Sequence, residues 1–231
     1  WGPTGFTQGT YTTVFTTNDT LSISGLPADS CIEFYIWTNC TASGNGISSI
    51  KGPYTLCTPC ANANLNYTED FNSWPPQCVS VDVGDVSWSQ NNGWAMASLW
   101  GLGGLNYIMD LQNVDISADA RVSFRWSHNY LAANPNDDLA VLARPENSSV
   151  WDTIWYRTGA NFNSQDGATN FTPGTGVLER INLPTSYTGQ VVEFRLHANS
   201  DSGPRLFVDD FVVDSIPDCI DPIGFSIVAL T

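Results

Sequence analysis

The chain has 231 residues and a formal net charge of −15, from 23 acidic and 8 basic side chains. A surface this acidic repels polyanions, so it excludes nucleic acids and acidic lipid surfaces as partners. It is compatible with the binding of hard cations through oxygen ligands, and equally with a surface that only keeps an exported protein soluble.

Composition predicts an all-β protein. Its 19 glycines and 13 prolines punctuate short segments rich in Thr, Val, Trp, Tyr and Phe, and no long segment keeps a helical period. The six cysteines lack zinc-type spacing and favour disulfides in an oxidising compartment. No run is apolar enough to span a membrane and no signal peptide precedes Trp1, so we expect a segment of a longer exported chain.

Residues 1–60 are expected to form short strands between turns. Ile32, Phe34 and Ile36 alternate along one such strand, and residues 52–57 form its expected partner. Together with residues 1–6, these segments resemble the end of the fibronectin type III repeats in large secreted proteins of the Bacteroidota. The corner tyrosine of that family is replaced by Ile32, and Trp1 matches a position late in the third strand, so the first strands of such a domain are missing.

Residues 61–215 predict a complete second sandwich. It opens with residues 66–78 and closes with a hairpin whose arms are residues 191–198 and 205–213. The segments between them that match strands, in order, are residues 122–126, 137–144, 151–156 and 181–183. This order resembles the MAM-like jelly-roll domains of secreted and cell-surface proteins, except that Asn72 replaces the glutamate usual after the phenylalanine. Residues 216–231 resemble the first strand of a following fibronectin-type domain.

The resemblance also assigns the cysteines. The four nearest the first domain junction are expected to form two disulfides, Cys31–Cys57 across the hairpin and Cys60–Cys78 at the entry to the middle domain. Cys40 lies where the first strand of its own domain should begin, and Cys219 has the same place relative to the next repeat. Both are therefore expected to bond neighbouring repeats and not one another.

Two adjacent carboxylates predict a structural calcium site. Asp209 and Asp210 interrupt an apolar strand, where a buried carboxylate needs a partner. The jelly-roll resemblance places this last strand beside the first, so the predicted ligands are Glu69, Asp70, Asn72, Asp209 and Asp210. Hard cations take several oxygen ligands, and a divalent ion relieves the repulsion between carboxylates. The alternative is that Asp209 or Asp210 faces solvent or accepts hydrogen bonds from backbone amides.

Catalytic chemistry has little support. A serine nucleophile needs a histidine base, and the two histidines, His128 and His197, are expected at the surface or within a sheet. Acids are too plentiful for a chance pair to indicate a glycosidase. The pair Asp137 and Asp138 is a second candidate for a cation site, but turn chemistry explains residues 134–137 without a metal. No glycine-rich phosphate loop opens a helix. We therefore expect no enzyme.

Three tryptophans near residue 90 leave two interpretations open. Trp88, Trp94 and Trp100 surround a Ser-Gln-Asn-Asn-Gly turn, where an exposed ring beside amides would hold a sugar, whereas core packing is commoner. Trp94 is expected to be the most exposed and is the predicted glycan contact. Three residues match the O-glycosylation pattern of the Bacteroidota, the source that the resemblance implies: Thr20, Thr153 and Ser215.

These features predict a non-enzymatic, extracellular or cell-surface protein. The expected role is a structural, adhesive repeat unit of a large surface adhesin or filament, of the kind used in gliding motility. Its partners would be neighbouring repeats or subunits of the same protein, and surface glycans. The alternative is an accessory carbohydrate-binding module of a secreted hydrolase.

Overall fold

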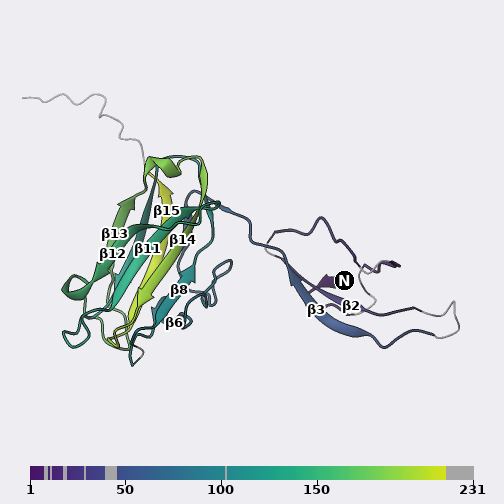
Figure 1. The fold of residues 1–231 in the computed structure, drawn as a ribbon, viewed down its shortest axis with the longest axis horizontal. Helices are drawn as coiled ribbons and strands as arrows, with labels where there is room; N and C mark the ends of the chain where they lie inside the picture. The colour runs from purple at the N-terminus through teal and green to yellow at the C-terminus, as the bar shows by residue number, and fades with distance from the viewer. Residues whose placement is uncertain are drawn as a thin grey trace, which may run out of the picture. The chain divides into compact units, whose positions relative to one another are not determined.

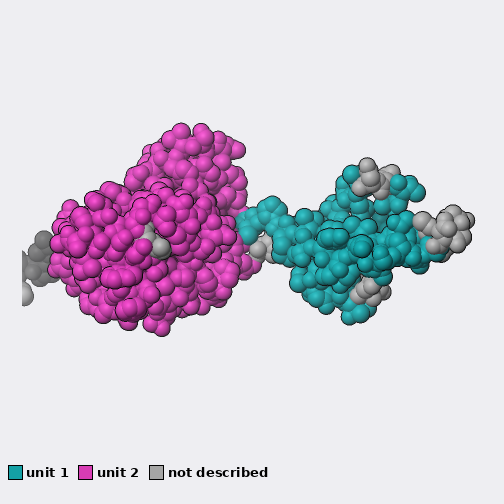
Figure 2. Space-filling view, turned by 60° about the horizontal axis from the view of Figure 1, so that its bottom comes forward, with its two compact units in different colours: residues 1–61 teal, residues 62–231 magenta. Residues whose placement is uncertain are grey.

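A computed structural model describes residues 1–7, 10, 12–17, 20–28, 30–39, 46–101 and 103–216. The chain divides into two compact units, Trp1–Ala61 and Asn62–Thr231, called unit 1 and unit 2 below (Figure 2). The predicted domain identities are not tested by this division. Cys40, Cys219 and the predicted strand after residue 216 lie outside the described residues.

The predicted all-β class is confirmed, with 43% of the chain in strands. The described residues contain no α-helix, and short 3₁₀ turns such as η2 (Gly159–Asn161) and η3 (Thr185–Tyr187) connect strands instead. In the part of the chain that the structure describes, no helix has the length and apolar character needed to cross a membrane.

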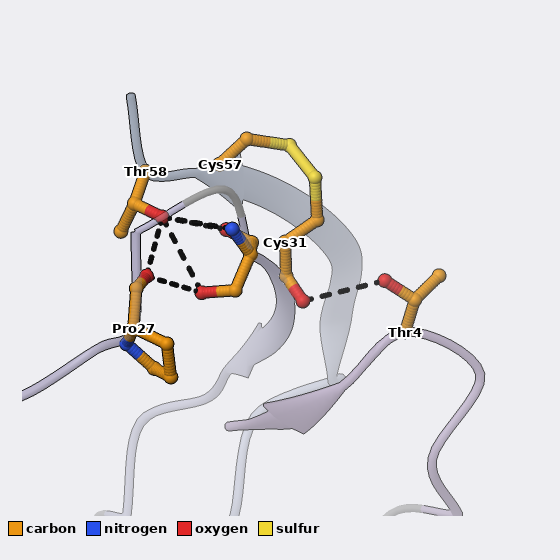
Figure 3. The surroundings of a disulfide bond; sticks show 6 residues. Thr4, Pro27, Cys31, Cys57 and Thr58 are labelled. Atoms are coloured by element: carbon orange, nitrogen blue, oxygen red, sulfur yellow. Dashed lines mark hydrogen bonds between the residues drawn. A yellow bond between two sulfur atoms is a disulfide. The ribbon is translucent and has the colours of Figure 1, made fainter. Parts of the chain in front are cut away.

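Unit 1 contains a three-stranded antiparallel sheet (Figure 1). Its strands lie in the order β1 (Gly2–Pro3), β2 (Cys31–Ile36) and β3 (Lys51–Cys57). Cys31 lies directly opposite Cys57 and forms the predicted disulfide with it (Figure 3). Cys60 and Cys78 are also disulfide-bonded, and their pairing with each other stays a prediction.

A hydroxyl fastens the chain beside this disulfide. The Thr58 hydroxyl donates to the Pro27 carbonyl over 2.7 Å and accepts a hydrogen bond from the Ser30 amide over 2.9 Å (Figure 3). The segment before β2 is thereby tied to the segment after β3. These local bonds matter because Ile32 is the one apolar side chain of unit 1 that is buried among the described residues.

Unit 2 is a sandwich of two six-stranded sheets (Figure 1). Sheet I has the order β13-β10-β15-β7-β6, and β5 also pairs with β15. Its strands are β5 (Tyr67–Glu69), β6 (Ser89–Asn91), β7 (Trp94–Ala97), β10 (Ala120–Ser127), β13 (Val177–Asn182) and β15 (Leu206–Ser215).

Sheet II has the order β12-β11-β14-β9-β4, and β8 also pairs with β14. Its strands are β4 (Ala63–Asn64), β8 (Asn106–Asp110), β9 (Val114–Ile116), β11 (Asp138–Pro145), β12 (Asp152–Thr158) and β14 (Gln190–Asn199). Except for β4 with β9, the strands pair antiparallel, so each strand can bury one face and expose the other.

The core lies between the two sheets and is rich in aromatic rings. Phe124 of sheet I meets Trp155 of sheet II edge to face, with ring centroids 5.0 Å apart, and Phe211 meets Phe194 across the same space at 5.9 Å. Phe124, Phe194 and Phe211 are fully buried. Each such side chain contributes roughly 2–3 kcal/mol by leaving water, so these cross-sheet pairs hold the layers together.

The predicted closing hairpin is wrong, because its arms lie in opposite sheets. β14 pairs with β8, β9 and β11, whereas β15 pairs with β5, β7 and β10. Both arms have an apolar face, and these faces meet across the core through Phe194 and Phe211. The connection crosses the end of the sandwich, where the Ser200 hydroxyl donates to the Leu99 carbonyl over 2.6 Å. The predicted neighbourhood of the first and last strands is correct, since Glu69 of β5 pairs with Phe211 of β15.

Candidate functional site

The break in the apolar pattern of the last strand is a β-bulge. Ser123 of β10 pairs with Val212, but Arg125 pairs with Asp209, so two residues of β15 lie opposite one of β10 and β15 has one extra residue. Asp210 has φ of 51°, in the left-handed region that aspartate tolerates better than most residues. The Asp-Asp pair therefore marks a local change in strand geometry.

Asp209 and Asp210 also lie where β15 changes its neighbour on the edge opposite β10. There β15 pairs with β7 before the bulge and with β5 after it. The Asp209 carboxylate accepts a hydrogen bond from the Asp210 amide over 2.8 Å. Burial raises the pKa of Asp209 to about 6, and the charges of Asp210 and Asp70 act in the same direction. Arg125 partly offsets this effect and pairs with Asp210 over 3.2 Å.

The predicted calcium ligands share this junction, but several of their carboxylates already accept hydrogen bonds from nearby backbone amides. Glu69 accepts a hydrogen bond from the Phe71 amide over 2.8 Å, and Asp70 accepts one from the Asn72 amide over 3.0 Å. Among the described residues, no three or more His, Cys, Asp or Glu side chains are grouped so that they could hold a metal. Asp209 thus accepts a hydrogen bond from a backbone amide, as the alternative given above expects, Glu69 and Asp70 do likewise, and calcium binding stays a prediction.

The three tryptophans near residue 90 differ in exposure. Trp88 is buried, Trp94 is half-buried, and Trp100 is 59% exposed. The expectation that Trp94 is the most exposed is therefore wrong. Its ring packs against Gly176, where a Cβ would come within 2.6 Å of the indole. A glycan contact at Trp94 stays a prediction.

Of the predicted O-glycosylation residues, Thr20 and Thr153 are exposed and Ser215 is half-buried. Glycosylation at these three positions stays a prediction. Because Thr153 is exposed, its hydroxyl is accessible on the outer side of β12.

His128 is buried, against the expectation of a surface or sheet position. Only 1% of it is exposed, and its ring stacks on Phe162 with centroids 4.3 Å apart. Burial lowers the pKa of His128 to about 4, so the ring is neutral at pH 7. Its Nδ1 lies 3.4 Å from the Arg205 carbonyl and its Nε2 lies 3.8 Å from Asp137. In the described part of the chain it has no hydroxyl or thiol positioned for catalysis.

Asp137 belongs to a buried turn, so turn chemistry explains only part of its role. Its Oδ1 accepts hydrogen bonds from the amides of Asp201 (2.6 Å) and Gly203 (3.3 Å), while its Oδ2 has no hydrogen-bond partner among the described residues. Burial raises the pKa of Asp137. The carboxylate thus fastens the connection between β14 and β15 to the start of β11.

The outer face of sheet II carries polar side chains that the sequence did not indicate as a common site, although His197 and Asp138 were considered singly. β12, β11, β14 and β8 lie in consecutive order in this sheet (Figure 1). Their register places two rows of side chains across the four strands. Listed from β12 to β8, the rows are Tyr156, Ala140, His197 and Ile108, then Thr158, Asp138, Asn199 and Asn106.

Hydrogen bonds fix the polar members of these rows. Asp138 accepts from the Asn199 backbone amide (3.0 Å) and side-chain amide (2.8 Å), and from the Tyr156 hydroxyl (3.2 Å). His197 Nε2 lies 3.1 Å from Asn106 Oδ1. Burial lowers the pKa of His197 and raises the pKa of Tyr156, so both rings are uncharged at pH 7. The face therefore combines neutral aromatic rings with oriented donors and acceptors.

A depression of about 410 Å³ lies at β12, the edge strand of sheet II that carries Tyr156 and Thr158 of the two rows. Its described lining consists of Tyr156, Arg157, Thr158 and Asn161. Tyr156 is 47% exposed. An exposed ring offers a surface for the C–H face of a sugar, while hydroxyl, amide and guanidinium groups can bond its hydroxyls. The depression thus has the chemistry of a carbohydrate subsite.

No protein-family model matches the sequence, and the search of curated proteins returned no match. Among solved structures, the K1 cleaved adhesin domain of Lys-gingipain from Porphyromonas gingivalis W83 has a TM-score of 0.48 and 16% identity, covering 66% of this chain and 99% of that one. TmCBM27, a carbohydrate-binding module described with specific mannan recognition, has a TM-score of 0.42 and 11% identity, covering 66% of this chain and 98% of that one. The MAM-like and fibronectin type III resemblances stay predictions.

Proposed function

We propose that this chain is a non-enzymatic, extracellular adhesive module that binds a glycan on the outer face of sheet II. The observation that carries the proposal is the exposed Tyr156 ring at the depression, next to hydrogen-bonded Asp138 and Asn199. A sugar needs both a flat apolar surface and fixed polar partners, and this face supplies both.

The fixed side chains favour binding because less conformational freedom is lost when the ligand arrives. Ala140 lies between Tyr156 and His197 in its row, so a small side chain separates two rings. The net charge of −15 favours a neutral or basic glycan over an acidic one. The ligand class we propose is therefore an uncharged oligosaccharide.

An extracellular location is supported by the disulfide-bonded cysteines, because disulfides persist in oxidising compartments. The repeat unit, the filament and the gliding-motility role expected from the sequence stay predictions, as do neighbouring repeats as partners. The alternative, an accessory module of a secreted hydrolase, would use the same glycan-binding face.

A glycan array with the full chain, followed by calorimetric titration of the best ligand, tests the proposal. We expect Tyr156→Ala to weaken binding at least tenfold, which corresponds to about 1.4 kcal/mol. Phe171→Ala is the matched control, because this ring is also exposed, at 64%, but lies outside the two rows. Binding that depends on Trp94 and not on Tyr156 would move the site to sheet I. A chain that binds no glycan at all would overturn the proposal.

A further inference from the structure

The sheet of unit 1 has an apolar face that the described residues leave largely uncovered. Ile32 pairs with Leu56 and Phe34 pairs with Tyr54, so these four side chains share a face. Ile32 is only 5% exposed, but Leu56 and Tyr54 are 49% and 46% exposed. Ile36, further along β2, is 55% exposed. A sheet normally buries such a face against a second layer.

The edge of this sheet is also open. β3 is the last strand in the order β1-β2-β3, and no other strand of the described part of unit 1 pairs with it. All seven of its residues are exposed. An open edge presents unpaired N–H and C=O groups, which can pair with a further strand. Unit 1 therefore offers both a backbone template and an apolar surface beside it.

The chain itself contains a segment with the matching pattern. Residues 222–230 lie outside the described part of the chain. Within them, the apolar residues Ile223, Phe225 and Ile227 alternate with Gly224 and Ser226. Period-two alternation is typical of a half-buried strand. The segment carries no charged side chain, so its apolar side chains favour burial against an apolar surface over exposure to water.

We propose that residues 222–230 of one copy of the chain add as a strand along the open edge of β3 in a second copy. Backbone hydrogen bonds would supply affinity, and side chains on alternate positions would supply specificity. In this arrangement Ile223, Phe225 and Ile227 continue the apolar face that Leu56 and Tyr54 leave exposed. The inference concerns assembly and does not rest on glycan binding.

The contact is heterologous, because the donor segment and the acceptor edge are different parts of the chain. Each copy carries one donor and one acceptor, so copies join head to tail and the assembly grows with concentration.

Sedimentation velocity of the full chain over a wide concentration range tests the proposal. We expect the wild type to associate progressively, and Phe225→Asp (donor) and Leu56→Asp (acceptor) each to be monomeric. An equimolar mixture of the two variants should form a one-to-one dimer and nothing larger, because only one intact donor and one intact acceptor remain. Leu178→Asp is the control, since it changes an exposed apolar residue of unit 2 and should associate like the wild type.

A second measurement guards against misfolding of the Leu56→Asp variant. Hydrogen exchange of residues 54–57 should be slower in the wild type than in Phe225→Asp, whose substitution lies outside unit 1. Equal exchange in these two proteins would overturn the proposal. So would a wild type that stays monomeric, association that survives in both variants, or variants that form no dimer when mixed.

Discussion

The Nε2 atom of His128 lies 3.8 Å from the Oδ2 atom of Asp137, and both side chains are almost fully buried. Burial lowers the pKa of His128 from 6.5 to about 4. Between these values the folded state binds fewer protons than the unfolded state. The stability that neutral His128 contributes is therefore complete above pH 6.5 and is lost as the pH falls toward 4.

This loss of stability should appear as a difference in the free energy of unfolding between the wild type and His128→Gln. We expect the wild type to lose about 3 kcal/mol relative to the variant between pH 6.5 and 4, because one pKa unit corresponds to about 1.4 kcal/mol. The raised pKa of Asp137 acts in the opposite direction, with stability lost as the pH rises, but Asp137 is present in both proteins. Urea unfolding of both proteins at several pH values measures the difference. A difference that does not vary with pH would contradict the assignment.

Asp209→Asn should raise the melting temperature at pH 7. Burial raises the pKa of Asp209 from 3.8 to about 6, so its charge disfavours the folded state above pH 6, and this penalty disappears below pH 3.8. We expect a clear increase at pH 7 and little change near pH 4, measured by calorimetry. Asp214→Asn is the control: Asp214 accepts two hydrogen bonds from Arg121, at 2.9 and 2.8 Å, so its loss should lower the melting temperature at pH 7. A larger gain for Asp209→Asn at pH 4 than at pH 7 would be inconsistent with the raised pKa.

Bound calcium would reverse the effect of Asp209→Asn on the melting temperature. An ion held by the predicted ligands would stabilise the wild type in proportion to its occupancy. We expect added calcium to raise the melting temperature of the wild type over its value in a chelator, and to have no effect on Asp209→Asn. Magnesium is the control, because Mg²⁺ binds to flexible sets of oxygen ligands less readily than Ca²⁺ does. Identical wild-type values in calcium and in chelator would rule out the predicted site.

Removal of the Cys31–Cys57 disulfide should destabilise unit 1 alone. The bond closes a loop with a sequence separation of 26 residues, for which loop-closure entropy corresponds to about 3 kcal/mol. Unit 1 has little apolar burial to replace this, whereas the core of unit 2 is separate. We expect the double variant Cys31→Ser/Cys57→Ser to lose protection from hydrogen exchange in β2 and β3 and to keep it in β10 and β14. Equal losses in both units would show that the bond stabilises more than its own sheet.

Gly203→Ala should destabilise unit 2 strongly. A Cβ at this position would lie 1.6 Å from the buried Oδ2 of Asp137, which has no room to move in a packed turn. We expect a loss of about 3 kcal/mol or more in urea unfolding. Gly104→Ala is the matched control, because its φ is +81° but nothing lies within 4 Å, so only backbone strain of about 1 kcal/mol applies. Similar losses in the two variants would argue against the steric cause.

Period-two patterns predicted which residues of unit 2 are buried, but not which strands pair. In β14, Phe194 and Leu196 alternate with Arg195 and His197, and the first pair is buried as expected. The same pattern fits a hairpin and a crossing between layers equally well. Whether the chain forms a hairpin or crosses to the other sheet depends on the contacts of the connection that begins at Ser200. The Ser200 hydroxyl bonds the carbonyl of Leu99, which lies far away in the sequence.

The candidate glycan-binding face could not be found from the sequence for the same reason. Tyr156, Ala140 and His197 form a row only through the registers of β12, β11 and β14, which long-range pairing determines. His128 was misplaced because its burial depends on Phe162 and the turn at Asp137. The pattern break at Asp209 and Asp210 was visible in the sequence because it is local to one strand, but it was interpreted as a cation site and not as a bulge.

The pairing of β5 with β15 has a consequence for synthesis on the ribosome. The first strand of sheet I finds its neighbour only in the last strand of the unit, and the central strand β14 precedes that last strand directly. Sheet I therefore cannot be completed over the core until the end of β15 has left the exit tunnel. A nascent chain stalled before that point should therefore remain sensitive to protease throughout unit 2. Folding of this unit should be slow once it begins, since most of its sheet contacts join distant parts of the sequence.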